Sequence, residues 1–83
     1  MDVKVLGTGC SKCKMLFAEA EKAVTASGLP VSLAKVEKID EIMKYGVMMT
    51  PALVIDGEVK CSGRIPSANE IVSWLTTAAA RNG

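Results

Sequence analysis

Two cysteines, Cys10 and Cys13, are the residues of this chain whose types and spacing point most directly to chemistry. They stand three positions apart, and on a helix residues i and i+3 share one face, close enough for their sulfurs to bond with little strain. If the helix begins near Cys10, its unpaired backbone N–H groups and the positive end of its dipole favour the Cys10 thiolate. The spacing therefore predicts a redox-active pair with Cys10 as nucleophile and Cys13 as resolving thiol.

The elements around the pair must hold it at the end of a buried strand. Residues 3–6 are nearly all apolar, which is typical of a central strand covered on both faces. After the cysteines, apolar residues recur at helical spacing until Gly28, which is expected to end the helix. Residues 31–36 read as a second strand, and a strand, a helix and a strand joined in this way form a unit with parallel strands.

The second half of the chain predicts a short helix, a hairpin and a terminal helix. Asp40 is the expected cap of the short helix, and Asp56-Gly57 is a strong hairpin signal after the apolar run 52–55. In the return strand, Val59 and Cys61 are expected on one inward face. A capping-box pattern at 67–70 starts the last helix. The predicted fold class is α/β with the order βαβαββα, a four-stranded mixed sheet flanked by three helices.

Composition limits the possible functions. The chain has 83 residues, so residues 1–83 are expected to form one domain, and a monomer. A net charge of +1 and one Trp, one Tyr and one Phe offer nucleic acid neither a basic surface nor a stacking platform. The N-terminal apolar run is too short for the core of a leader peptide or for a membrane span, so neither is expected there. Three cysteines, an odd number, argue against a secreted disulfide framework and favour the cytoplasm.

The chain resembles the small thioredoxin/glutaredoxin-like redox-active disulfide proteins of prokaryotes. The resemblance rests on the cysteine motif of residues 9–13, on Thr50-Pro51 ahead of the third strand and on Asp56-Gly57, and it covers essentially the whole chain. It implies a thioredoxin-like fold and a thiol–disulfide oxidoreductase that reduces protein disulfides. It also implies that the Cys10–Cys13 disulfide is itself the redox group, so that no bound cofactor and no metal are expected.

The resemblance further implies a substrate groove and an electron donor. Pro51 would follow a cis peptide bond facing the sulfurs, and the backbone of Thr50 would pair with an extended segment of a disulfide-containing protein. A thioredoxin-reductase-like flavoprotein or glutathione would restore the dithiol. The substrate-binding residues expected on this basis are Gly9, Ser11, Lys12, Met49, Thr50 and Pro51.

The sequence departs from typical thioredoxins beside the sulfurs. Gly9 stands where those proteins carry tryptophan, and Ser11-Lys12 replaces their usual intervening pair. The buried acid that typical thioredoxins carry on the central strand is also missing, because residues 3–6, the central strand expected here, contain no carboxylate. Water is therefore the expected proton acceptor for Cys13.

Two other functions are compatible with the same cysteines. Thiolates bind soft metals, so a metal or metalloid carrier is the main alternative, although three cysteines without histidine cannot close a four-ligand zinc site in a monomer. A binding module whose shape responds to disulfide formation is the third hypothesis. Cys61 is expected to be a small core residue rather than a third reactive thiol.

Overall fold

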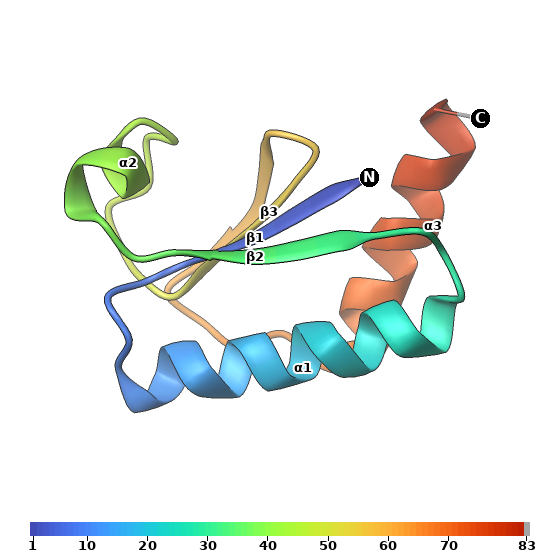
Figure 1. Ribbon diagram of the computed structural model, residues 1–83, viewed down its shortest axis with the longest axis horizontal. Coiled ribbons are helices and arrows are strands. Elements are labelled where there is room, and N and C mark those ends of the chain that lie inside the picture. The colour runs from blue at the N-terminus through green and yellow to red at the C-terminus, as the bar shows by residue number, and fades with distance from the viewer. Residues whose placement is uncertain (83) are drawn as a thin grey trace.

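The computed structural model describes residues 1–82, so Gly83, the last residue of the expected domain, lies outside the described residues. The elements follow the predicted order βαβαββα (Figure 1). The strands are β1 (Asp2–Leu6), β2 (Ser32–Val36), β3 (Ala52–Ile55) and β4 (Glu58–Ser62), and the helices are α1 (Ser11–Ser27), α2 (Ile39–Met43) and α3 (Ala68–Asn82).

The four strands form one mixed sheet in the order β2-β1-β3-β4. Strand β1 runs parallel to β2 and antiparallel to β3, and β4 pairs antiparallel with β3. The central place of β1 follows from its sequence, since Val3 and Val5 are buried on one face and Leu6 on the other. The predicted fold class is confirmed.

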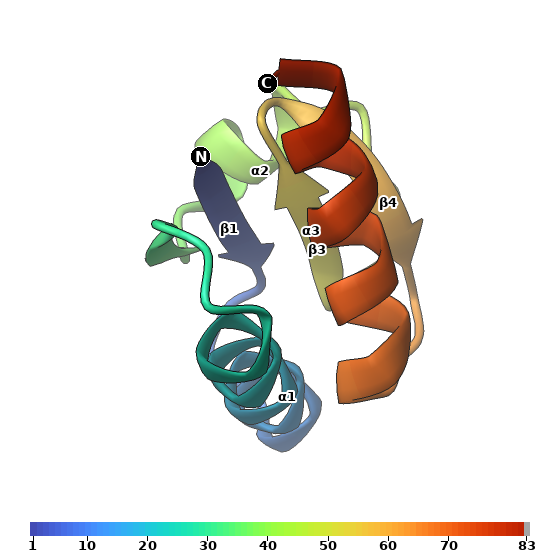
Figure 2. The same cartoon turned by 90° about the vertical axis from the view of Figure 1, so that its right-hand side faces the viewer.

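Helices cover the two faces of the sheet unequally. Helices α1 and α3 pack side by side on one face, over a core that includes Leu16, Leu53 and Ile71 (Figure 2). The short helix α2 covers the other face with Ile42, next to Leu6 and neighbouring apolar residues. The larger core therefore lies beneath α1, the helix that begins at the cysteine motif.

Helix α1 ends as its sequence predicts. Gly28 follows Ser27 with φ of 67°, a left-handed conformation that glycine adopts without a steric penalty. The face of the helix that carries Leu16, Ala20 and Ala23 is buried. Cys13 belongs to that same buried row, so its sulfur is directed inward from the first turn.

The hairpin between β3 and β4 forms at Asp56-Gly57 as predicted, with positive φ at both residues. The prediction for β4 is wrong in one respect, because the ladder contains a bulge: Leu53 pairs with Cys61, whereas the next residue, Val54, pairs with Val59. The extra residue turns Val59 and Cys61 to opposite faces of the sheet. Cys61 enters the core beneath α1 and α3, and Val59 packs against the α2 side.

The starts of the other two helices differ in how they match the sequence. Asp40 does not cap α2, since the cap position is Lys38 and Asp40 lies in the first turn, where its charge suits the helix dipole. At α3 the predicted cap forms in part, with the backbone N–H of Glu70 donating to Ser67 Oγ at 3.2 Å. The Glu70 carboxylate pairs instead with Arg64, at 3.0 Å.

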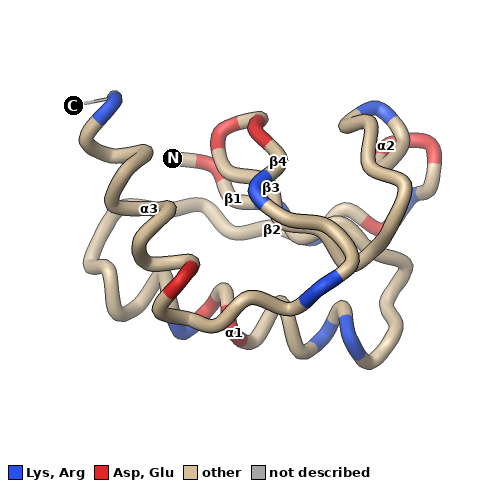
Figure 3. Tube along the Cα trace, turned by 180° about the vertical axis from the view of Figure 1, so that it is seen from behind, with Lys and Arg blue, Asp and Glu red and all other residues tan. Residues whose placement is uncertain are grey.

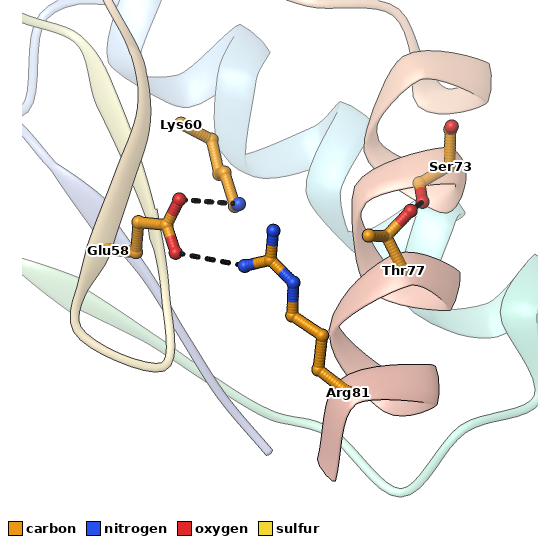
Figure 4. Close-up of polar contacts among 5 residues, drawn as sticks. All are labelled: Glu58, Lys60, Ser73, Thr77 and Arg81. Atoms are coloured by element: carbon orange, nitrogen blue, oxygen red, sulfur yellow. Dashed lines mark hydrogen bonds and ion pairs between the residues drawn. The ribbon is translucent and has the colours of Figure 1, made fainter. Parts of the chain in front are cut away.

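Ion pairs connect the hairpin to the end of α3. The Glu58 carboxylate accepts a hydrogen bond from Lys60 at 3.0 Å and lies 3.6 Å from the Arg81 guanidinium (Figure 4). Exposed pairs of this kind contribute little to stability. Positive and negative residues are both spread along the chain (Figure 3), in keeping with the net charge of +1. Within residues 1–82 no helix is long and apolar enough to cross a membrane.

Candidate active site

The cysteine motif and the Thr50-Pro51 segment meet at one end of the sheet. Leu6, the last residue of β1, pairs with Ala52, the first residue of β3. Because the two strands are antiparallel, the chain leaving Leu6 toward the cysteines and the chain arriving through Pro51 flank the same end of the sheet (Figure 1). The register of β1 and β3 thus brings together two segments that are about forty residues apart in sequence.

The two sulfurs are adjacent and differ in exposure. Cys10 occupies the N-cap position of α1 and is exposed, whereas the Cys13 side chain is only 6% exposed. Their Sγ atoms lie 2.9 Å apart, within reach of an S–H···S hydrogen bond. An incoming disulfide can therefore reach Cys10 but not Cys13.

The environment separates the pKa values of the two thiols. A hydrogen bond from Cys13, together with backbone N–H groups at the start of α1, lowers the pKa of Cys10 below its ordinary value. Burial raises the pKa of Cys13, and its hydrogen bond to Cys10 raises it further. Either sulfur could donate in this hydrogen bond, and the lower pKa of Cys10 together with the higher pKa of Cys13 favours Cys13 Sγ–H as the donor, in agreement with the predicted roles.

Two glycines make room for this arrangement, and the role of the first, Gly7, was not predicted from the sequence. A methyl group at Gly7 would overlap Cys13 Sγ and lie 3.1 Å from Cys13 Cβ. Gly9 has φ of +94°, which disfavours any side chain there. The cluster of two glycines between strand and helix was a sequence signal for close approach, but the approaching atom could not be inferred from it.

The Thr50-Pro51 segment enters β3 at the same end of the sheet. The Thr50–Pro51 peptide bond is cis, Thr50 is exposed and Pro51 is buried. The backbone N–H of Gly63 donates to the Pro51 carbonyl oxygen at 2.9 Å. Met49 lies over Gly63, where an added Cβ would meet its Cε at 3.0 Å. Gly63, for which the sequence suggested no role at the site, therefore contacts this segment through both its backbone and the space above it.

The remaining predicted substrate-binding residues are open to solvent. Ser11 and Lys12 form the exposed first turn of α1, beside Cys10. Met49 is 62% exposed and Met48 is 96% exposed, so thioether side chains dominate the surface of the Thr50-Pro51 segment. Such flexible, polarizable side chains suit contact with varied apolar partners.

The third cysteine lies apart from the pair. Cys61 is 8% exposed and belongs to the core beneath α1 and α3, as predicted, and burial raises the pKa of its thiol. Within residues 1–82, no group of three or more His, Cys, Asp or Glu side chains could hold a metal ion. The site therefore offers two sulfurs as its reactive groups.

Comparison with known proteins assigns this arrangement to a family. The model of the thioredoxin domain matches residues 1–76. The chain belongs to the thioredoxin family. A thioredoxin of Methanothermobacter thermautotrophicus is 38% identical over 76 residues, which cover 92% of this chain and 99% of that protein. A thioredoxin of Methanocaldococcus jannaschii is 35% identical over 73 residues, which cover 88% of this chain and 84% of that protein.

The family and the site agree on the kind of chemistry. Cys10 and Cys13 form a CxxC pair in this chain, and this pair together with the thioredoxin relatives identifies the chain as a thiol–disulfide oxidoreductase. The resemblance drawn from the sequence is confirmed.

Proposed function

We propose that this protein reduces disulfide bonds in other proteins, with Cys10 as nucleophile and Cys13 as resolving thiol. One observation supports this most strongly: an exposed Cys10 sulfur at a helix N-cap lies 2.9 Å from the buried Cys13 sulfur. The Cys10 thiolate attacks a substrate disulfide and forms a mixed disulfide, releasing one substrate thiolate. Cys13 then attacks Cys10, releasing the second substrate thiolate and leaving the Cys10–Cys13 disulfide.

The groove for the substrate is proposed to lie between Cys10 and the Thr50-Pro51 segment. Thr50 is exposed, and its backbone would pair with an extended stretch of the substrate, which supplies affinity without demanding a particular sequence. Met49, Gly9, Ser11 and Lys12 would line the groove. The exposed methionine supports contact with varied apolar side chains.

The cycle requires an external electron donor. Each turnover leaves the Cys10–Cys13 pair oxidised by two electrons, which a flavoprotein of the thioredoxin-reductase type or glutathione would return. The dithiol persists only where the surroundings are reducing, so the cytoplasm is the compartment that the proposal requires. A reductase assay with each donor in turn distinguishes the two.

Trapping of the mixed disulfide tests the proposal. We expect the Cys13→Ser variant, mixed with insulin as a disulfide substrate, to accumulate a covalent adduct detectable by mass spectrometry. The Cys10→Ser variant should form none, and Cys61→Ala, the matched control, should turn over like the parent protein. Failure of Cys13→Ser to form an adduct would contradict the assignment of Cys10 as nucleophile.

A further inference from the structure

The second step of the proposed cycle requires an acceptor for the Cys13 proton, and the sequence alone predicted only water for this role. In the mixed disulfide Cys10 is bonded to substrate and no longer carries a thiolate, so it cannot take the proton from Cys13. Cys13 is 6% exposed, and β1 beneath it presents Val3 and Val5 rather than a carboxylate. A thiol attacks a disulfide only after it has lost its proton.

One small cavity is lined both by Cys13 and by a residue with a carboxylate, Glu37. It has a volume of about 120 Å³ and is lined by Cys13, the glycines 7 and 9, and the side chains of Lys14, Lys35 and Glu37, among others. A site for one water needs about 10–15 Å³ of such space and polar partners. The cavity can therefore hold a short chain of water molecules between the Cys13 sulfur and the polar groups that line it.

Glu37 is held beside the cysteine loop by the backbone. It follows Val36, the last residue of β2, whose carbonyl oxygen accepts a hydrogen bond from Gly7 N–H at 3.0 Å. Its carboxylate reaches toward Gly9, where an added Cβ would lie 3.3 Å from Glu37 Oε2. Glu37 is exposed, so a proton that it accepts can pass on to bulk water.

The other charged groups at the cavity cannot serve as acceptors. Lys14 comes from the first turn of α1 and Lys35 from β2, where its ammonium lies 4.6 Å from the centre of the Phe17 ring. A protonated lysine carries three N–H donors and no acceptor site. Among the described residues that line the cavity, Glu37 is the one carboxylate.

We propose that Glu37 accepts the Cys13 proton, through water in this cavity, when Cys13 attacks the mixed disulfide. The proton moves from Cys13 Sγ through water to the Glu37 carboxylate and then to solvent. The freed electron pair of Cys13 forms the Cys10–Cys13 bond, and the electron pair of the broken Cys10–substrate bond leaves with the substrate sulfur as a thiolate. The cysteine pair is oxidised and the substrate disulfide is reduced. The inference rests on the proposed function, because only that function includes this step.

A single-turnover experiment isolates the step. Reduced protein in excess is mixed with 5,5′-dithiobis(2-nitrobenzoic acid), which releases a coloured thiolate when Cys10 attacks and a second one when Cys13 resolves the adduct. The second phase is intramolecular, so its rate does not depend on protein concentration. Because the leaving thiolate needs no proton, this rate reports the deprotonation and attack of Cys13. Glu37→Gln removes the acceptor, Glu37→Asp retains a carboxylate, and Glu21→Gln on α1 is the matched control.

The change expected in the second-phase rate of Glu37→Gln is opposite in direction to the change that loss of the negative charge alone would cause. A nearby carboxylate disfavours a thiolate, so removal of its charge alone would speed the second phase near neutral pH. Loss of a proton acceptor slows it, and we expect a decrease of at least about 10-fold in Glu37→Gln, an intermediate rate in Glu37→Asp and no change in Glu21→Gln. The defect should disappear at high pH, where hydroxide removes the proton, whereas a structural defect would persist.

Failure of the Glu37 proposal and failure of the proposed function give different results in this experiment. An unchanged or faster second phase in Glu37→Gln, with the first phase intact, would overturn the role of Glu37 and leave the proposed function standing. Absence of the first phase in the parent protein would overturn the proposed function itself, and the inference with it.

Discussion

Substitution of Gly7 by alanine is the sharpest test of how tightly the resolving sulfur is packed. The added methyl would overlap Cys13 Sγ and lie 3.1 Å from its Cβ, and Leu16, one turn further along α1, is fully buried. Helix α1 is therefore poorly able to move away. Overpacking of this kind costs about 1–3 kcal/mol of unfolding free energy. For a domain of this size each kcal/mol lowers the melting temperature by roughly 4–8 °C.

Considered from the backbone conformation alone, Gly7→Ala should stabilise the protein rather than destabilise it. Gly7 does not have a positive φ, unlike Gly9, so alanine is compatible with its conformation. In such positions glycine-to-alanine changes stabilise proteins by about 0.4–1 kcal/mol, through loss of freedom in the unfolded chain. When the sulfur is removed by Cys13→Ala, only the 3.1 Å contact with the Cβ of residue 13 remains, so the Gly7→Ala change should lose most of its cost.

Thermal unfolding of four proteins measures how the effect of Gly7→Ala depends on the Cys13 sulfur. The parent, each single variant and the double variant are unfolded in reducing buffer and followed by circular dichroism. We expect a coupling energy of at least about 1.5 kcal/mol between positions 7 and 13. An equal loss of stability from Gly7→Ala with and without the Cys13 sulfur would refute the packing argument.

Two further predictions follow from the ends of the helices. In reduced protein, the rate of Cys10 alkylation by iodoacetamide should rise with pH around a midpoint below that of an ordinary thiol, because hydrogen bonds from Cys13 and from backbone N–H groups lower the pKa of Cys10. Cys13→Ala should move that midpoint upward, and an unmoved midpoint would show that the Cys13 hydrogen bond is unimportant. Ser67→Ala should lower the unfolding free energy by about 0.5–2 kcal/mol, since Ser67 Oγ caps α3. Ser73→Ala, an exposed change inside α3, is the control; equal stability of Ser67→Ala and its parent would contradict the role of the cap.

Most of the fold was predicted from short sequence patterns, because the strand, the helix end and the turn that they mark depend on neighbouring residues. The apolar run of β1 required cover on both faces, Gly28 ended α1, and Asp56-Gly57 formed its hairpin with positive φ at both residues. The prediction for Val59 and Cys61 was wrong because a bulge depends on how β4 pairs with β3 rather than on the alternation within β4. Asp40 does not cap α2 because the helix begins at Ile39, two residues before the start that an Asp40 cap would give.

The sequence by itself determined the chemistry of this protein, since two cysteines at helical spacing after a buried strand specify a sulfur pair at a helix N-terminus. The tertiary structure decided what surrounds the pair. Pairing of β1 with β2 brings Glu37 to the loop that carries Cys10, and packing of α1 against the sheet brings Cys13 onto Gly7. These contacts join residues of different elements, so their positions depend on strand register and helix packing, which no local sequence pattern encodes.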